Sequence, residues 1–137
     1  EAFIEHVEAS DQKKVVFLAS RAGSIGSIQP PANLYSYRAS KMAVHLFAYN
    51  LSLELPERGI LVGIVNPGIV DTKGVLDLKP GDPVPEAFKD LMPLIESGAL
   101  QLMRPPESIS AMIERIDELS PDTNGVFQEY DGSVIPW

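Results

Sequence analysis

The sequence predicts an α/β fold with a parallel β-sheet, and two apolar runs with a helix between them carry this prediction. Residues 15–19 and residues 59–65 are apolar at nearly every position. Strands with this pattern are hidden on both faces, which is typical of a parallel sheet that helices cover on both sides. Between the runs, residues 36–55 repeat apolar side chains at helical steps until Pro56 and Gly59 end the helix.

Four further segments complete the expected elements. Residues 1–9 have apolar side chains at helical spacing without a recognisable cap, and residues 125–130 form a short third strand. Residues 86–102 are expected to be broken helix, because a proline and a glycine interrupt them. A cleaner helix starts at Pro105, and its expected apolar side is formed by Ile109, Met112, Ile113 and Ile116.

The composition argues against several classes of partner and site. The 137 residues carry a net charge of −8, which argues against nucleic acid or an anionic membrane as a partner, since both attract basic patches. The chain has no cysteine and only His6 and His45 as histidines, so nothing suggests a disulfide or a metal centre. No run approaches the roughly 18 apolar residues of a membrane span, and the start lacks the zones of a signal peptide. We therefore expect a soluble, cytoplasmic protein.

Tyr37 and Lys41 stand four residues apart at the head of the central helix, which places them on one helix face. A phenol ordinarily ionises near pH ~10 and carries protons poorly at neutral pH unless a positive charge stabilises its anion. The ammonium of Lys41 can supply that charge. A tyrosine tuned in this way gives a proton to a carbonyl oxygen, or takes one from an alcohol, while hydride moves at the carbon.

Two more signals follow the two predicted strands directly. Ser20 comes after the first strand, and Pro67 with Gly68 comes after the second. Ligands of open parallel sheets bind beyond the carboxyl ends of the strands. We therefore expect these residues and Tyr37 to meet at one edge of the sheet.

A serine after one strand, Tyr-x-x-x-Lys on the next helix and Pro-Gly after the following strand resemble the short-chain dehydrogenase/reductase family. The loop that begins at Ser20, the doubled tyrosine at Tyr35 and Tyr37, and the ending from Asp131 to Trp137 look most like carbonyl reductases of the C-factor or sniffer type. The resemblance covers essentially the whole chain. It implies a partial Rossmann-like, doubly wound parallel sheet, the second half of the family fold, with about three strands and flanking helices.

The same resemblance implies that residues 1–137 are the single C-terminal portion of a dinucleotide-dependent dehydrogenase domain. The Gly-rich turn of the N-terminal, dinucleotide-binding half is not found in the sequence, and the family's catalytic asparagine is expected upstream of Glu1. We therefore expect the chain alone to bind dinucleotide poorly and to be inactive.

The resemblance gives three residues catalytic roles. Ser20 would hydrogen-bond the substrate carbonyl, Tyr37 would act as general acid or base, and Lys41 would act on the tyrosine and bind the nicotinamide ribose. Ser24 is the alternative serine, because its separation from Tyr37 is nearer to the family's usual spacing. Ser20 is preferred because it directly follows the strand and fits an Ala-Ser-x-x-Gly pattern, which leaves the extra residues to a proline bulge at residues 30–31.

The resemblance also implies a cofactor site formed by Tyr37, Lys41, Pro67, Gly68, Val70 and Thr72. Pro67 and Gly68 would form the wall beside the nicotinamide ring. The backbone of Val70 and the side chain of Thr72 would lie near its carboxamide and phosphates, and Thr72 has a second interpretation as a helix cap. Tyr35 is expected to be a wall of the substrate pocket or a packing residue.

The implied function is an NAD(P)-dependent oxidoreductase that interconverts a carbonyl and an alcohol. NADP or NAD would be the cofactor, with NADP favoured by the carbonyl reductase resemblance, and the substrate would be a small carbonyl or alcohol. Sugar-nucleotide epimerases and dehydratases share Tyr-x-x-x-Lys, but the short tail ending at Trp137 argues against them. The alternative is a non-catalytic fragment or pseudo-enzyme that acts through protein contacts. Its exposed apolar surface would drive pairing with an N-terminal half or with a second copy as a homo-oligomer.

Overall fold

A parallel β-sheet forms the centre of the computed structural model, which describes residues 2–30 and 33–137. The strands lie in the order β1–β2–β5, formed by β1 (Lys14–Leu18), β2 (Leu61–Asn66) and β5 (Phe127–Glu129). All pairings within this sheet are parallel. The predicted α/β fold with three parallel strands and flanking helices is therefore confirmed.

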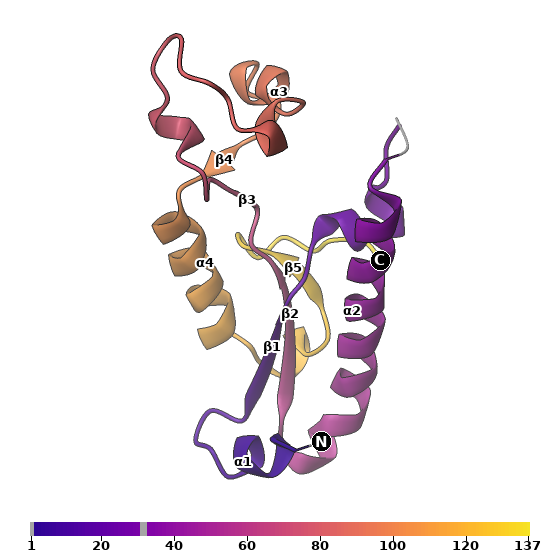
Figure 1. Cartoon of the computed structure of the whole chain (residues 1–137). Helices are drawn as coiled ribbons and strands as arrows, with labels where there is room; N and C mark the ends of the chain where they lie inside the picture. Colours follow the sequence, from indigo (N-terminus) through magenta and orange to yellow (C-terminus); the bar gives the residue numbers. More distant parts are fainter. Residues whose placement is uncertain (1, 31–32) are drawn as a thin grey trace.

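The central strand β2 is hidden on both faces. Ile64 and Val65, whose side chains point to opposite faces, are both buried, as the continuous apolar pattern predicts. One face of the sheet is covered by α2 (Tyr35–Glu54) and the other by α4 (Pro105–Asp117) (Figure 1). Among the described residues β1 pairs only with β2, so its other edge is open.

Short helical elements connect the larger ones: α1 (Ile4–Glu8), η1 (Arg21–Gly23), η2 (Ile25–Ser27), η3 (Leu55–Arg58) and η6 (Pro121–Thr123). Gly59 ends η3 with a φ of 71°, a left-handed conformation that glycine adopts without strain. The bulge expected at residues 30–31 includes Pro31, which lies outside the described residues. No helix in the described part of the chain is long and apolar enough to cross a membrane.

The apolar side predicted for α4 is only partly correct. Ser108 is 1% exposed and donates a hydrogen bond to the carbonyl oxygen of Pro67 at 2.7 Å, so it faces the interior. Met112 is partly buried, whereas Ile109 and Ile113 are 50% and 51% exposed. A serine occupies the buried position because its hydroxyl finds a partner there, which an apolar pattern does not reveal.

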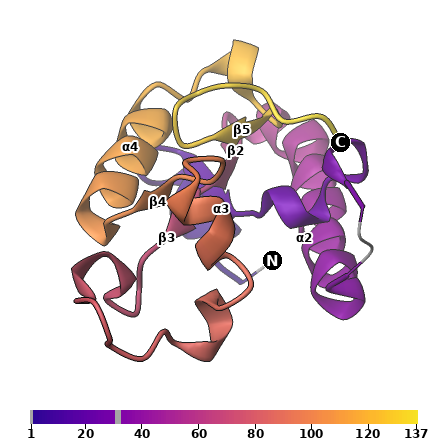
Figure 2. The ribbon, with the colours of Figure 1, turned by 90° about the horizontal axis from the view of Figure 1, so that it is seen from above.

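A smaller unit stands beyond the carboxyl ends of the sheet strands. Here β3 (Ile69–Val70) pairs in parallel with β4 (Leu102–Met103), and between them lie η4 (Val75–Asp77), η5 (Glu86–Phe88) and α3 (Met92–Glu96). We call residues 75–101 the lid. Viewed from above, α3 lies over the space between α4 and α2 (Figure 2). The broken helix expected in residues 86–102 is confirmed, and the β3–β4 pair was not predicted because each strand has only two residues.

Candidate active site

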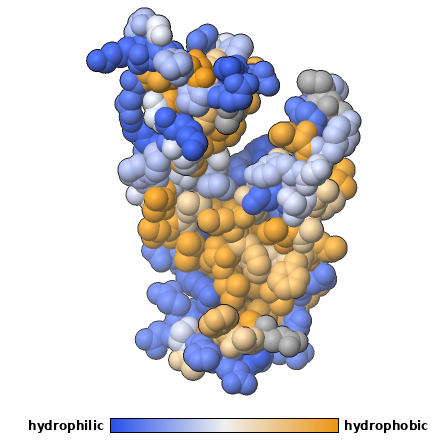
Figure 3. All heavy atoms as spheres, in the orientation of Figure 1, coloured by the Kyte–Doolittle hydropathy of each residue, from blue (hydrophilic) through white to orange (hydrophobic). Residues whose placement is uncertain are grey.

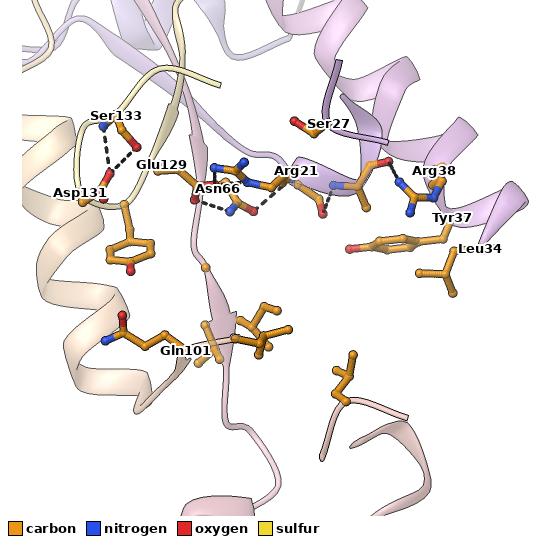
Figure 4. Close-up of a pocket in the computed structure, with 18 of the residues that line it drawn as sticks. Arg21, Ser27, Leu34, Tyr37, Arg38, Asn66, Gln101, Glu129, Asp131 and Ser133 are labelled. Carbon is orange, nitrogen blue, oxygen red and sulfur yellow. Dashed lines mark hydrogen bonds and ion pairs between the residues drawn. The ribbon is translucent and has the colours of Figure 1, made fainter. Parts of the chain in front are cut away.

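A large cavity lies between the carboxyl ends of the sheet strands and the lid (Figure 4). Its volume is about 990 Å³. The sheet and α2 line it with Ser20, Tyr37, Asn66 and Glu129, and the lid lines it with Leu91 and Leu100. Polar groups around the sheet therefore face a lid surface that is mainly apolar and also includes Gln101.

Ser20 lies two residues past the end of β1 and is the N-cap residue of η1. Its Oγ accepts a hydrogen bond from the backbone N–H of Ala22 at 3.2 Å, which leaves the hydroxyl proton of Ser20 free to donate. The backbone N–H of Ser20 donates to Nε2 of His45 at 3.5 Å. His45 is 3% exposed, and burial lowers its pKa, an effect that the nearby ammonium of Lys41 reinforces. The imidazole is thus kept in the neutral form, which can accept this bond.

Tyr37 lies in the first turn of α2 and is 46% exposed. Figure 4 shows its phenolic oxygen pointing into the cavity. The Nζ of Lys41 lies 5.8 Å from the centroid of the Tyr37 ring, as the four-residue spacing predicts. Lys41 itself is not among the residues that line the cavity.

The start of α2 is tied to the loop that carries Ser20. Arg38 donates to the carbonyl oxygens of Asn33 at 3.1 Å and of Ala22 at 3.2 Å. Gly23 lies so close to the helix that a Cβ there would come within 2.7 Å of the backbone of Lys41. Because only glycine permits this approach, the loop stays against α2 and Ser20 shares a cavity with Tyr37.

Ser24, the alternative serine, lies in a different environment. It is 0% exposed and is not among the residues that line the cavity. Its hydroxyl donates to the carbonyl oxygen of Pro136 and accepts from the backbone N–H of Ser27 at 3.1 Å. Its hydrogen bonds fasten the loop to the C-terminal segment.

Only some of the residues expected at the cofactor wall line the cavity. Gly68 and Val70 line the cavity, but Pro67 and the exposed Thr72 do not. Gly68 has a φ of +77°, and a Cβ there would lie 3.0 Å from the ring of Tyr130, so this corner requires glycine. Thr72 does not cap a helix, because η4 begins after Gly74.

Tyr35 does not form the expected pocket wall or a packing contact in the interior. It is 74% exposed and does not line the cavity. Two residues along an α-helix turn the side-chain direction by about 200°, so Tyr35 faces away from the side of α2 on which Tyr37 lines the cavity.

Three polar residues of the cavity were given no role from the sequence, namely Arg21, Asn66 and Glu129. Their side chains form a hydrogen-bonded ring beside Ser20. Each stands at or just past the carboxyl end of a sheet strand, and that position is the signal by which they could have been found.

Asp71 anchors the chain as it enters the lid. Its carboxylate accepts hydrogen bonds from the backbone N–H groups of Lys73 at 3.2 Å, Val75 at 2.8 Å and Leu76 at 2.8 Å. Burial opposes the charged form, but these backbone donors outweigh it, so the pKa of Asp71 lies below its usual value. Within the described residues, no group of three histidine or carboxylate side chains could hold a metal ion.

Comparison with known proteins places the fold and the motifs in one family. The model of the short chain dehydrogenase family matches residues 1–82. An uncharacterised oxidoreductase of Schizosaccharomyces pombe is 31% identical over all of this chain and 52% of its own length. The 1-hydroxy-2-glutathionyl-2-methyl-3-butene dehydrogenase of a Rhodococcus species is 32% identical over 90% of this chain and 46% of its own length. The chain thus spans about half the length of these relatives.

Solved structures show the same fold. The NADPH-bound carbonyl reductase from chicken fatty liver superposes with a TM-score of 0.73 at 23% identity, over 99% of this chain and 50% of its own. The carbonyl reductase Sniffer of Drosophila melanogaster gives a TM-score of 0.69 at 21% identity, over 99% of this chain and 49% of its own. With a family model matched over more than half of its residues, the chain belongs to the short-chain dehydrogenase family.

Proposed function

We propose that the protein is an NAD(P)-dependent oxidoreductase that interconverts a carbonyl and an alcohol, and that this chain carries the catalytic half. The observation that carries the proposal is that Ser20 and Tyr37 line one cavity, with the phenolic oxygen of Tyr37 pointing into it (Figure 4). The names of a related dehydrogenase and of structurally similar carbonyl reductases support the same class of reaction.

Each catalytic residue has a defined task in this proposal. The free hydroxyl proton of Ser20 donates to the substrate carbonyl oxygen and stabilises the negative charge that develops there. Tyr37 gives a proton to that oxygen in reduction and removes one in oxidation. Lys41 is proposed to act on the tyrosine, and its Nζ lies 5.8 Å from the centroid of the Tyr37 ring. The buried Ser24, whose hydroxyl is occupied, supports the choice of Ser20.

The cavity has room for the nicotinamide end of a dinucleotide, and three of the residues expected to hold it, Tyr37, Gly68 and Val70, line the cavity. Its volume of about 990 Å³ is at the upper end of ordinary ligand pockets. When bound, this cofactor supplies or accepts the hydride. The residues proposed to hold it are Tyr37, Lys41, Pro67, Gly68, Val70 and Thr72. NADP is favoured over NAD because two structurally similar reductases were solved with NADPH or NADP bound.

Substitution of the phenol tests the proposal. In the full-length protein, Tyr37→Phe should lower kcat for carbonyl reduction on the order of 10²–10⁴-fold, because proton transfer is lost while the ring is kept. Tyr35→Phe is the matched control, since it removes the same atom from an exposed tyrosine two positions away, and it should leave kcat unchanged. Near-normal turnover by Tyr37→Phe would refute the assignment.

The chain alone is proposed to be inactive, because it lacks the Gly-rich turn for the dinucleotide phosphates. The 137-residue chain should therefore show no NADPH oxidation with a carbonyl substrate that the full-length protein reduces. Turnover by this chain at the rate of the full-length protein would contradict the proposal. A cytoplasmic location is also part of the proposal and rests on the sequence.

A second candidate is a non-catalytic chain that acts through protein contacts, and one observation favours it. An apolar face surrounds the open edge of β1 between α4 and α2 (Figure 3). On it Leu18 is 57% exposed and Phe47 is 59% exposed. Apolar side chains beside an unpaired strand edge are typical of a surface that another chain covers.

Light scattering after size-exclusion chromatography tests pairing through this face. We expect the isolated chain to form dimers or to capture the N-terminal half of the family fold. We expect Phe47→Lys to weaken that pairing by placing a charge in the contact. A monodisperse monomer of 14.9 kDa would argue against pairing through this face.

A further inference from the structure

Arg21, Asn66 and Glu129 form a closed ring of hydrogen bonds next to Ser20 (Figure 4). The Nε of Arg21 donates to Oε1 of Glu129 at 2.5 Å, and an Nη of the same guanidinium pairs with that oxygen. The Nδ2 of Asn66 donates to Oε2 of Glu129 at 2.5 Å. The ring closes where the backbone N–H of Arg21 donates to Oδ1 of Asn66 at 3.2 Å.

Two members of the ring are buried, so they need hydrogen-bond partners within the protein. Glu129 is 6% exposed and Asn66 is 7% exposed, so their polar atoms depend on each other and on Arg21 rather than on water. A buried carboxylate is stable only with a cation and hydrogen-bond donors around it. Glu129 therefore holds the Arg21 side chain against the sheet, although that side chain is 54% exposed toward the cavity.

The ring joins the carboxyl ends of the three sheet strands. Asn66 ends β2, Glu129 ends β5, and Arg21 follows β1 by three residues. With the ring in place, each of three consecutive backbone N–H groups has a hydrogen-bond acceptor. The N–H groups of Ser20, Arg21 and Ala22 donate to His45, to Asn66 and to the Ser20 hydroxyl.

We propose that Glu129 and Asn66 are positioning residues that act through Arg21 to hold the Ser20 hydroxyl at the angle needed to donate to the substrate oxygen. The inference rests on the proposed role of Ser20 in the same cavity. Neither residue needs to touch the reacting atoms. Their effect is to prevent rotation of the peptide that follows Ser20, whose N–H is bound to Asn66.

A reciprocal exchange of amide and carboxylate tests the ring. In Glu129→Gln, a Gln amide group must face either the Asn66 amide or the guanidinium, so one donor meets another donor. In Asn66→Asp, two carboxylates face each other, and like charges repel. The double variant restores the matching of donors and acceptors around the ring, because the Gln amide can donate to the new carboxylate while its oxygen accepts from Arg21. Only the direct ion pair of the guanidinium with a carboxylate is not restored. Net charge and side-chain size are the same as in the original pair.

Kinetics of the full-length protein distinguish positioning from general stability. Each single variant should lower kcat for carbonyl reduction on the order of 10–100-fold with a smaller change in KM, and the double variant should recover most of the loss. Ser20→Ala should lower kcat strongly in the original background and far less in Glu129→Gln, since the serine is already misplaced there. Independent, multiplicative effects of Ser20→Ala and Glu129→Gln would overturn the proposal.

Spectroscopy provides a readout that does not need turnover. The ¹⁵N and ¹H shifts of the Ser20 and Arg21 amides, and the Arg21 Nε–H signal, should move in Glu129→Gln and return in the double variant. Unchanged amide signals in Glu129→Gln would overturn the positioning role. If the original protein reduces no carbonyl, the proposed function fails. The amide signals still decide whether the ring sets the geometry at Ser20.

Discussion

The sheet and the lid are stabilised in different ways. The sheet, with α2 and α4 on its faces, has a core that joins segments far apart in sequence. Ile60, Val62 and Phe127 belong to it and are at most 1% exposed. The lid has a separate, smaller core around Val75 and Phe88 and is joined to the sheet through short segments. The sheet region therefore supplies most of the polar side chains of the cavity, whereas the lid lines it mainly with apolar ones and with Gln101.

Truncation of one buried phenylalanine in each region should give the largest difference in the free energy of unfolding. Phe127→Ala should lower the free energy of unfolding by about 3–5 kcal/mol, because it empties the centre of the sheet core. Phe88→Ala, at a side chain 7% exposed in the lid, should loosen the lid and barely change the unfolding of the sheet. Urea unfolding of the full-length protein, together with amide hydrogen exchange, measures both. Equal losses would mean that lid and sheet unfold as one unit.

Two glycines with the same backbone conformation, one near the sheet and one in the lid, allow a second comparison of stability between the regions. Gly125 and Gly98 both have a φ of 73°, so alanine costs about 1–2 kcal/mol of strain at either position. At Gly125 a Cβ would also lie 2.2 Å from Oγ of Ser52, whereas nothing lies within 4 Å at Gly98. Gly125→Ala should therefore lower the free energy of unfolding by about 3 kcal/mol or more. Similar values for both variants would show that the contact with Ser52 relaxes freely.

Asp71 offers a test of the junction between the regions. Asp71→Asn should weaken the backbone hydrogen bonds that start the lid by roughly 1–3 kcal/mol. Because the pKa of Asp71 is lowered in the folded state, its stabilising effect is complete above the ordinary carboxyl pKa of about 3.9 and is lost as the pH falls below it. Hydrogen exchange at the amides of Val75 and Leu76 should report this loss. If hydrogen exchange at these amides still increases at low pH in Asp71→Asn, a group other than Asp71 causes the loss of stability.

The smallest expected effect lies in the sheet region, at His45. Its pKa is lowered by burial, so the unfolded chain binds a proton more readily, and stability should fall as the pH drops below about 6.5. His45→Gln should flatten the dependence of unfolding free energy on pH in that range. His6→Gln, at an exposed histidine, is the matched control. A slope unchanged by His45→Gln would contradict the buried neutral imidazole.

Ser20, Tyr37 and Lys41 could be proposed as catalytic residues from the sequence, because each of them has a local signal. Ser20 follows an apolar strand, and the spacing of Tyr37 and Lys41 places their side chains on one face of any helix. The pocket wall at Tyr35 and the alternative at Ser24 could not be judged in this way. Tyr35 is exposed at the start of a helix, and Ser24 is buried beneath the C-terminal segment. Both properties depend on how the chain folds back on itself and not on residue spacing.

The sequence by itself determined the family, the α/β fold and the order of strands and helix, because apolar periodicity and turn residues act over a few neighbouring positions. Only the tertiary structure decided which side chains surround Ser20. Arg21 lies 45 residues from Asn66 and 108 residues from Glu129 in the chain, and no local pattern links them. They meet because parallel strands bring their carboxyl ends to one edge, where buried polar groups must satisfy one another.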